Sequence, residues 1–162
     1  MDLLTYRTHE NAARFLPLLR RAAGVWNDVL SDLVDLREWV PPPPKFTTSV
    51  SRACNIVVRV AAPGEVRNPV NPDRVAVCQR LVPDYWQISL APEVTWALSG
   101  WNRFWGRGEN ALTCLIHELG HVFRMPHALN PDYVMHPTIG GTGKLSAREK
   151  QNYRVHFLQL LE

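Results

Sequence analysis

Apolar residues along the chain follow two different periodicities, and the changes between them mark the predicted elements. Strand-like composition, dense in apolar and β-branched residues, occurs at 3–7, 33–40, 54–61, 75–82 and 86–90. From about Asn11 to Leu30 the apolar residues instead recur at helical spacing, with Pro17 as either the first helical residue or a kink. The pattern therefore predicts five strands and a long helix after the first strand.

Two further helices are predicted in the second half of the chain. Asn110 is the expected N-cap of the first, and Pro126 ends it at or before Met125 because proline cannot continue a helix. Its apolar stripe comprises Leu112, Leu115, Ile116, Leu119 and Phe123. The second opens at Ser146 with Glu149 at N3, which is a capping box. Its expected core-facing residues are Tyr153, Phe157, Leu160 and Leu161.

Three loops have unusual composition. The prolines 41–44 predict an extended surface turn of fixed shape, with docking of an SH3-like partner as the alternative. Residues 62–73 are rich in proline, glycine and asparagine and predict a long loop. Four aromatic residues fall within 95–106, and we interpret them as anchors of a loop rather than as a stacking surface for a carbohydrate or a base.

The predicted helix that follows Asn110 carries the chemistry. His117 and His121 are four residues apart, so they lie on one helical face and point toward a common position. Imidazoles at this spacing can bind zinc, and Glu118 can reach a metal-bound water without ligating the metal. His127 follows Pro126, so the chain must turn back to present a third imidazole. Two histidines on a helix are often only structural, but Glu118 and His127 together favour a metal site.

The stretch from His117 to His127 resembles the zinc signature HExxHxxGxxH of the metzincin metallopeptidases, and its HELGH is similar to the matrixin branch. Met135 follows His127 by eight residues within Val-Met-His-Pro, which is similar to the Met-turn beneath the zinc ligands of that family. Arg124 stands where the family has a glycine in a left-handed conformation. The chain has no histidine in loop 62–73, so the structural metals of matrixins are not expected.

The resemblance implies an α+β fold. It has a twisted five-stranded mixed sheet with one antiparallel edge strand, two backing helices including the zinc helix, and a small C-terminal subdomain with the Met-turn and a final helix. Residues 1–162 are expected to form a single catalytic domain, with an upper subdomain at about 1–123 and a lower one at about 124–162. Matrixins have a Pro-x-Tyr wall for the side chain after the scissile bond, and the matching residues here are Pro137, Thr138 and Ile139.

These residues predict a zinc-dependent endopeptidase. One zinc ion on His117, His121 and His127 would activate a water, with Glu118 as general base and then general acid. The alternatives are an inactive, zinc-stabilised peptide-binding domain, which has no need of Glu118, and a non-peptidase zinc hydrolase. His136 and Cys114 are near the signature in sequence, but neither is expected to be a ligand.

The composition limits the kinds of partner that the protein is expected to bind. The formal net charge is +3 with scattered basic residues, which does not predict a nucleic-acid surface, and no apolar run is long enough to span a membrane. Cys54, Cys78 and Cys114 have unrelated spacings and are expected to be free thiols. The first residues lack the basic and apolar regions of a signal peptide, and they leave no room for a matrixin pro-segment. We expect a monomer that binds a protein or peptide substrate.

Overall fold

The structure is a computed structural model that describes residues 2–41, 54–98, 108–138 and 143–162. The strands are β1 (Asp2–Thr8), β2 (Val34–Glu38), β3 (Ile56–Val60), β4 (Ala76–Val82), β5 (Tyr85–Leu90), β6 (Trp96–Ala97) and β7 (Glu109–Asn110). The helices are a 3-10 turn η1 (Glu10–Phe15), α1 (Leu16–Val29), α3 (Ala111–Val122) and α4 (Ala147–Gln159). Each of the five strands predicted from the sequence is present.

The main sheet has the strand order β2-β1-β3-β5-β4. Neighbouring strands are parallel except for β4, which pairs antiparallel with β5. Strand β4 therefore forms one edge of the sheet. The predicted α+β fold, with a mixed five-stranded sheet and one antiparallel edge strand, is confirmed.

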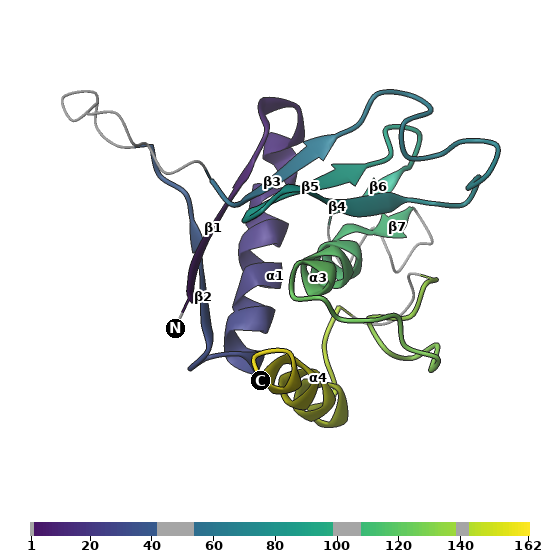
Figure 1. Cartoon of the computed structure of the whole chain (residues 1–162). Coiled ribbons are helices and arrows are strands. Elements are labelled where there is room, and N and C mark those ends of the chain that lie inside the picture. Colours follow the sequence, from purple (N-terminus) through teal and green to yellow (C-terminus); the bar gives the residue numbers. More distant parts are fainter. Residues whose placement is uncertain (1, 42–53, 99–107, 139–142) are drawn as a thin grey trace.

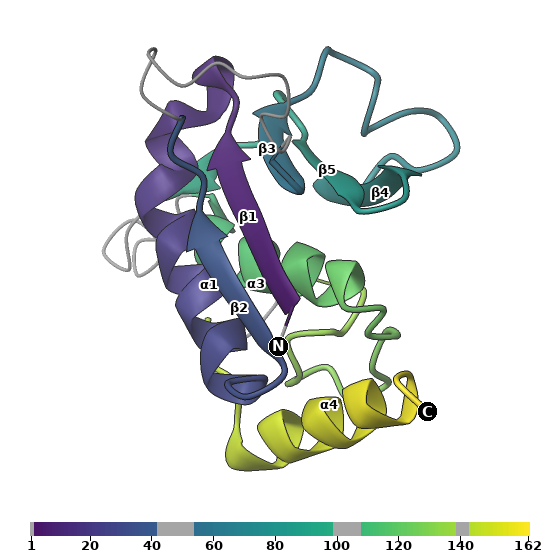
Figure 2. The ribbon, with the colours of Figure 1, turned by 60° about the vertical axis from the view of Figure 1, so that its left-hand side comes forward.

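Helices α1 and α3 cover one face of the twisted sheet, and α4 lies apart from the sheet (Figures 1 and 2). Helix α1 begins only at Leu16, after the 3-10 turn, and Pro17 lies in its first turn, where a missing N–H costs nothing. Trp26 of α1 is fully buried, and its Nε1 donates a hydrogen bond to the carbonyl oxygen of Ile116 at 2.8 Å. This bond joins α1 to the middle of α3.

The last helix, α4, has the predicted capping box, with Ser146 and Glu149 bonded in both directions. Tyr153 is buried and Phe157 packs against the core, as expected. The prediction for Leu160 and Leu161 is wrong, because these side chains are 42% and 60% exposed. The helix ends at Gln159, so the two leucines no longer follow the periodicity that would turn them inward.

A short parallel pair, β6 and β7, leads the chain into α3. The N–H of Glu109 donates to the carbonyl of Thr95 at 2.8 Å, and Gly108 has a positive φ of 104°. A side chain at Gly108 would overlap the Thr95 carbonyl, so this position requires glycine. Two predictions, the extended proline turn and the aromatic anchors of a loop, concern Pro42–Pro44 and Trp101–Trp105. These segments lie outside the described residues.

The three cysteines are free thiols, as predicted: Cys54 and Cys114 are buried and Cys78 is half-buried. Among the helices that the structure describes, none has the length and apolar character needed to cross a bilayer.

Candidate metal centre

Three histidine side chains converge beside helix α3. His117 and His121 lie one turn apart on the helix, and their Nε2 atoms are 3.0 Å from each other. His127 approaches from the loop beyond the helix, with ring centroids 5.3 Å from His117 and 4.9 Å from His121. One ligand atom from each ring fits within a group 4.8 Å across. The spacing in the sequence thus brings all three rings to one place.

Backbone carbonyls fix the tautomers of the two helical histidines. His117 Nδ1 lies 2.8 Å from the carbonyl oxygen of Val134, and His121 Nδ1 lies 3.1 Å from that of Met125. A carbonyl oxygen only accepts, so both Nδ1 atoms carry the proton and donate it. Both Nε2 atoms then present bare lone pairs to each other, an arrangement that a cation between them stabilises. Carbonyl-oriented neutral imidazoles are the usual zinc ligands, so the residues fit this metal.

Burial keeps these imidazoles neutral. His117 is 4% exposed, and the loss of hydration lowers its pKa to about 4, although its hydrogen bond to Val134 acts in the opposite direction. The pKa of His121 is also lowered, again mainly by burial. A metal ion therefore does not have to displace protons from either ring at neutral pH.

The chain reaches His127 through a sharp turn at the end of α3. The N–H of Met125 donates to the carbonyl of Gly120 at 3.0 Å, and Arg124 has a φ of 60°. This is the left-handed conformation that glycine favours, so Arg124 adopts the geometry expected of the glycine in the HExxHxxGxxH signature. Pro126 then prevents any return to helix.

Glu118 lies on the same helix and faces the same cavity. Its side chain is 5% exposed, and its Oε2 atom has no hydrogen-bond partner among the described residues. Burial raises the pKa of Glu118 to about 7, while the charge of Arg74 and the backbone N–H of Cys78 lower it. A buried carboxylate that titrates near neutrality, with a free oxygen, is suited to proton transfer.

Met135, the residue of the predicted Met-turn, lies against α3 at Gly120. It is fully buried, and the N–H of Ala128 donates to its carbonyl at 2.8 Å. A methyl group on Gly120 would overlap Met135 Sδ and come within 2.9 Å of Trp26 Cζ2. The missing side chain at Gly120 therefore allows the Met-turn to lie directly against α3.

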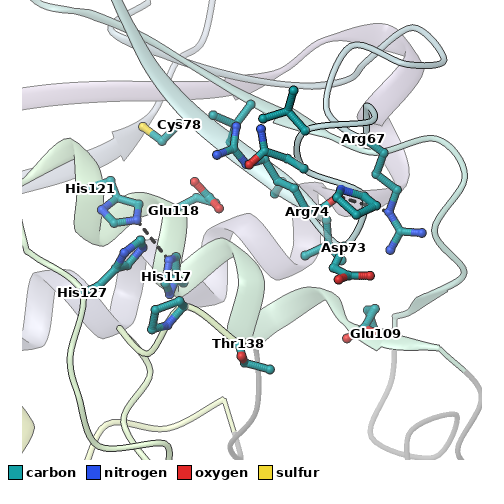
Figure 3. Close-up of a pocket in the computed structure, with 17 residues that line it drawn as sticks. Arg67, Asp73, Arg74, Cys78, Glu109, His117, Glu118, His121, His127 and Thr138 are labelled. Atoms are coloured by element: carbon teal, nitrogen blue, oxygen red, sulfur yellow. Dashed lines mark hydrogen bonds between the residues drawn. The ribbon is translucent and has the colours of Figure 1, made fainter.

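The histidines open into a cavity of about 910 Å³ (Figure 3). Its walls come from the loop before β4, from the first residues of β4, from α3 and from the segment after the Met-turn. The lining includes all three histidines, Glu118, Pro137 and Thr138. Ile139, the third residue of the predicted substrate wall, lies outside the described residues.

Two residues near the signature stand apart from the histidine group. Cys114 is fully buried, and His136 accepts a hydrogen bond from the N–H of Thr138 at 3.2 Å. Neither belongs to the group of side chains that could hold a metal. Both were expected not to be ligands, and this expectation remains a prediction.

The sequence interpretation missed the charged part of the wall. Arg67, Asp73, Arg74 and Glu109 also line the cavity. Three of them belong to the loop before β4, which the composition marked only as a loop. This loop comes directly before the edge strand, and that position could have indicated that its charged residues reach the cavity.

Comparison with known proteins rests on structure alone. No protein-family profile and no curated protein sequence matches the chain. The chain is similar to the crystal structure of archaemetzincin from Methanopyrus kandleri, with a TM-score of 0.53 and 14% identity over 98% of this chain and 96% of that one. It has the archaemetzincin fold.

A second match is a zinc-dependent peptidase from Methanocorpusculum labreanum, with a TM-score of 0.45 and 13% identity over 95% of this chain and 100% of that one. At these identities the likeness concerns the fold. In this fold, His117, Glu118 and His121 lie on α3, which packs against α1, and His127 lies in the loop that follows α3.

Proposed function

We propose that this protein is a zinc-dependent endopeptidase. One zinc ion would be held by His117, His121 and His127, and Glu118 would serve as the catalytic base. The observation that carries the proposal is the buried Glu118 carboxylate, which faces the same cavity as three imidazoles with available nitrogen lone pairs. A zinc site that served only to stabilise a binding domain would not require this carboxylate.

The chemistry divides between the metal and the chain. When bound, zinc polarises the scissile carbonyl and lowers the pKa of a coordinated water toward ~7. Glu118 takes a proton from the attacking water and later donates it to the leaving amine. With a pKa raised to about 7 by burial, Glu118 can accept and release this proton near neutral pH. No covalent bond forms between the chain and the substrate.

Among the described residues, no strand pairs with the outer edge of β4, and this edge supports a peptide as the substrate. The carbonyl of Val75 accepts from the N–H of Ala91, so the backbone at Val75 faces β5. Backbone groups alternate along a strand, and those of Ala76, Cys78 and Arg80 therefore face away from β5. The N–H of Cys78 already donates to Glu118, and a peptide can pair with the remaining groups as an added strand beside Glu118.

The matrixin branch is the finer part of the proposal. HELGH, the spacing of Met135 and the left-handed turn at Arg124 support it. The matching structures support a metallopeptidase of archaemetzincin fold without selecting this branch. We further propose that the protein acts as a monomer on proteins or peptides.

The test compares wild-type protein with Glu118→Ala and with a matched control, Glu93→Ala. Glu93 lies on the surface outside the cavity lining, where its carboxylate accepts from the N–H of Gly64. All three proteins are assayed for bound zinc and for cleavage of casein. Glu118→Ala should keep zinc and lose cleavage by orders of magnitude, because Glu118 is not a ligand. Cleavage by Glu118→Ala at the wild-type rate would refute the mechanism, and a wild-type protein that binds zinc and peptides without cleaving them would favour the binding domain.

A further inference from the structure

Two arginines from the loop before β4 line the same cavity as the histidines. Figure 3 shows Arg67 and Arg74 on the side of the view away from His121 and His127. Neither guanidinium belongs to an ion pair among the described residues, although Asp73 lines the cavity as well. Both positive charges are therefore available to a ligand that enters the cavity.

This loop is held in place by its own contacts. Arg67 Nε donates to the backbone carbonyl of Arg74 at 3.1 Å, which ties the two arginines together. Val66, next to Arg67, is 1% exposed and belongs to the core, and Glu65 pairs with Arg59 of β3. These contacts fix the backbone of the loop and the side chain of Arg67, which lowers the entropy cost of ordering this wall when a ligand binds.

The charges around the cavity favour an anionic ligand once the metal is bound. Arg67 and Arg74 carry two positive charges, and the carboxylates of Asp73, Glu109 and Glu118 carry at most three negative ones. A divalent cation held by imidazoles adds two positive charges, so the cavity is then positive overall. Arg74 lies two residues before β4 and lines the same cavity as Glu118.

Strand geometry predicts which part of a peptide reaches these arginines. Strand β4 runs from Ala76 to Val82 and passes Glu118 near Cys78. An added strand pairs slightly better when antiparallel, so its residues beyond the cut lie toward Ala76 and then Arg74. At about 3.3 Å per residue, and with the length of an arginine side chain, this corresponds to about two to four residues after the scissile bond.

We infer that Arg74, supported by Arg67, binds a carboxylate of the substrate about two to four residues C-terminal to the cut. The inference rests on the proposed peptidase function and adds its substrate class. The carboxylate belongs either to an aspartate or glutamate side chain or to the C-terminus of a short peptide. A guanidinium binds either one with two parallel hydrogen bonds.

The kinetic test uses the zinc-loaded protein and a set of quenched fluorescent peptides that share one sequence except at the position tested. In the first series, the third residue after the cut is Glu, Gln or Lys. In the second series, a shorter peptide ends at that third residue, either as a free acid or as an amide. The wild type should cleave the Glu peptide with a kcat/KM about tenfold above that of the Gln peptide. A matching preference for the free acid over the amide would identify the C-terminus as a second source of the carboxylate.

Arg74→Ala removes the guanidinium but keeps the carbonyl that Arg67 holds, so the loop should stay in place. This variant should bring the Glu-to-Gln ratio close to one with little change on the Gln peptide, and Arg74→Glu should favour the Lys peptide. Arg21→Ala, an exposed residue of α1 outside the cavity lining, is the control and should keep the wild-type ratio.

A binding measurement separates this inference from the proposed function. The affinities of the zinc-loaded Glu118→Ala variant for the same labelled peptides are measured by fluorescence anisotropy. Tighter binding of the carboxylate peptides that is lost on adding Arg74→Ala supports the inference, even if no peptide is ever cleaved by the wild type. Equal affinities for the Glu and Gln peptides and for the acid and amide peptides would overturn it, whether or not cleavage occurs.

Discussion

Glu149 of α4 accepts a hydrogen bond from the backbone N–H of Val134 at 2.8 Å. The carbonyl of the same Val134 accepts from Nδ1 of His117, also at 2.8 Å. Glu149 is 2% exposed, and its other oxygen accepts from the N–H and the hydroxyl of Ser146. The backbone of a single residue, Val134, thus links the cap of the last helix to a candidate metal ligand.

Glu149→Gln should therefore affect both stability and metal binding. An amide has only one oxygen, so one of these buried donors would face an NH2 group, at a cost of about 1–3 kcal/mol. Urea unfolding of the metal-free protein measures this cost, and zinc titration should show weaker binding. Arg148→Gln, one residue away and exposed, should change neither quantity. Unchanged zinc affinity in a destabilised Glu149→Gln would mean that Val134 does not transmit the effect to His117.

His127→Ala should reduce zinc occupancy sharply, because it removes one of three converging imidazoles. His136→Ala is the matched control, since His136 lies outside that group, and it should retain one zinc per chain. Metal analysis after equilibration with a zinc buffer measures both variants. Full occupancy in His127→Ala would rule out the three-histidine site.

Gly120→Ala should destabilise the protein by about 1–3 kcal/mol, because the added methyl group overlaps Met135 and crowds Trp26. Gly24→Ala provides the contrast, since a methyl group there meets nothing within 4 Å. Because Gly24 lies in the middle of α1, Gly24→Ala should stabilise the protein by about 0.5–1 kcal/mol. Chemical denaturation of the two variants should give changes of opposite sign, and equal changes would contradict the close packing of the Met-turn against α3.

Arg124→Gly should stabilise the protein by about 0.5–1 kcal/mol, because Arg124 has a φ of 60° that glycine adopts without strain. The gain is limited by the larger conformational freedom of glycine in the unfolded chain. Thermal unfolding measures the effect, with Arg148→Gly in α4 as a control that should be destabilised. A loss of stability in Arg124→Gly would show that the arginine side chain contributes more than the strain costs.

Cleavage sites should be enriched in Leu, Met or aromatic residues immediately after the cut. Pro137 and Thr138 line the cavity, and Met135, two residues before Pro137, is buried, which predicts an apolar pocket at that position. Each buried methylene adds about 1 kcal/mol of discrimination. A peptide-library digest analysed by mass spectrometry gives the preference. Charged residues at this position would show that another segment forms the wall.

Local patterns in the sequence predicted the five strands of the main sheet and the three α-helices, but not the short strands β6 and β7. The zinc helix is an example, because its N-cap Asn110, its apolar stripe and Pro126 are all local signals, and the structure has α3 at Ala111–Val122. The start of α1 was less well predicted, since the periodicity from Asn11 does not distinguish a 3-10 turn from an α-helix. Leu160 and Leu161 were placed in the core because the same periodicity does not show where α4 ends.

The candidate site was predictable to the extent that its residues are close in sequence. His117, Glu118 and His121 share one helix, and a proline and a positive φ bring His127 to them. Arg74 and Glu149 were not predicted, because each reaches the site through tertiary packing. Glu149 was recognised as part of a capping box, but nothing near it in sequence indicates its bond to Val134, fifteen residues away.

The order of the elements along the chain has a consequence for how the protein folds. Strand β1 pairs with both β2 and β3, and the sheet is complete only once β5 at Tyr85–Leu90 is available. The three histidines follow all five strands of this sheet in sequence. During synthesis, a chain long enough to form the whole sheet therefore exists before any of these imidazoles has been added. Metal capture is then a late event that acts on a scaffold already able to assemble.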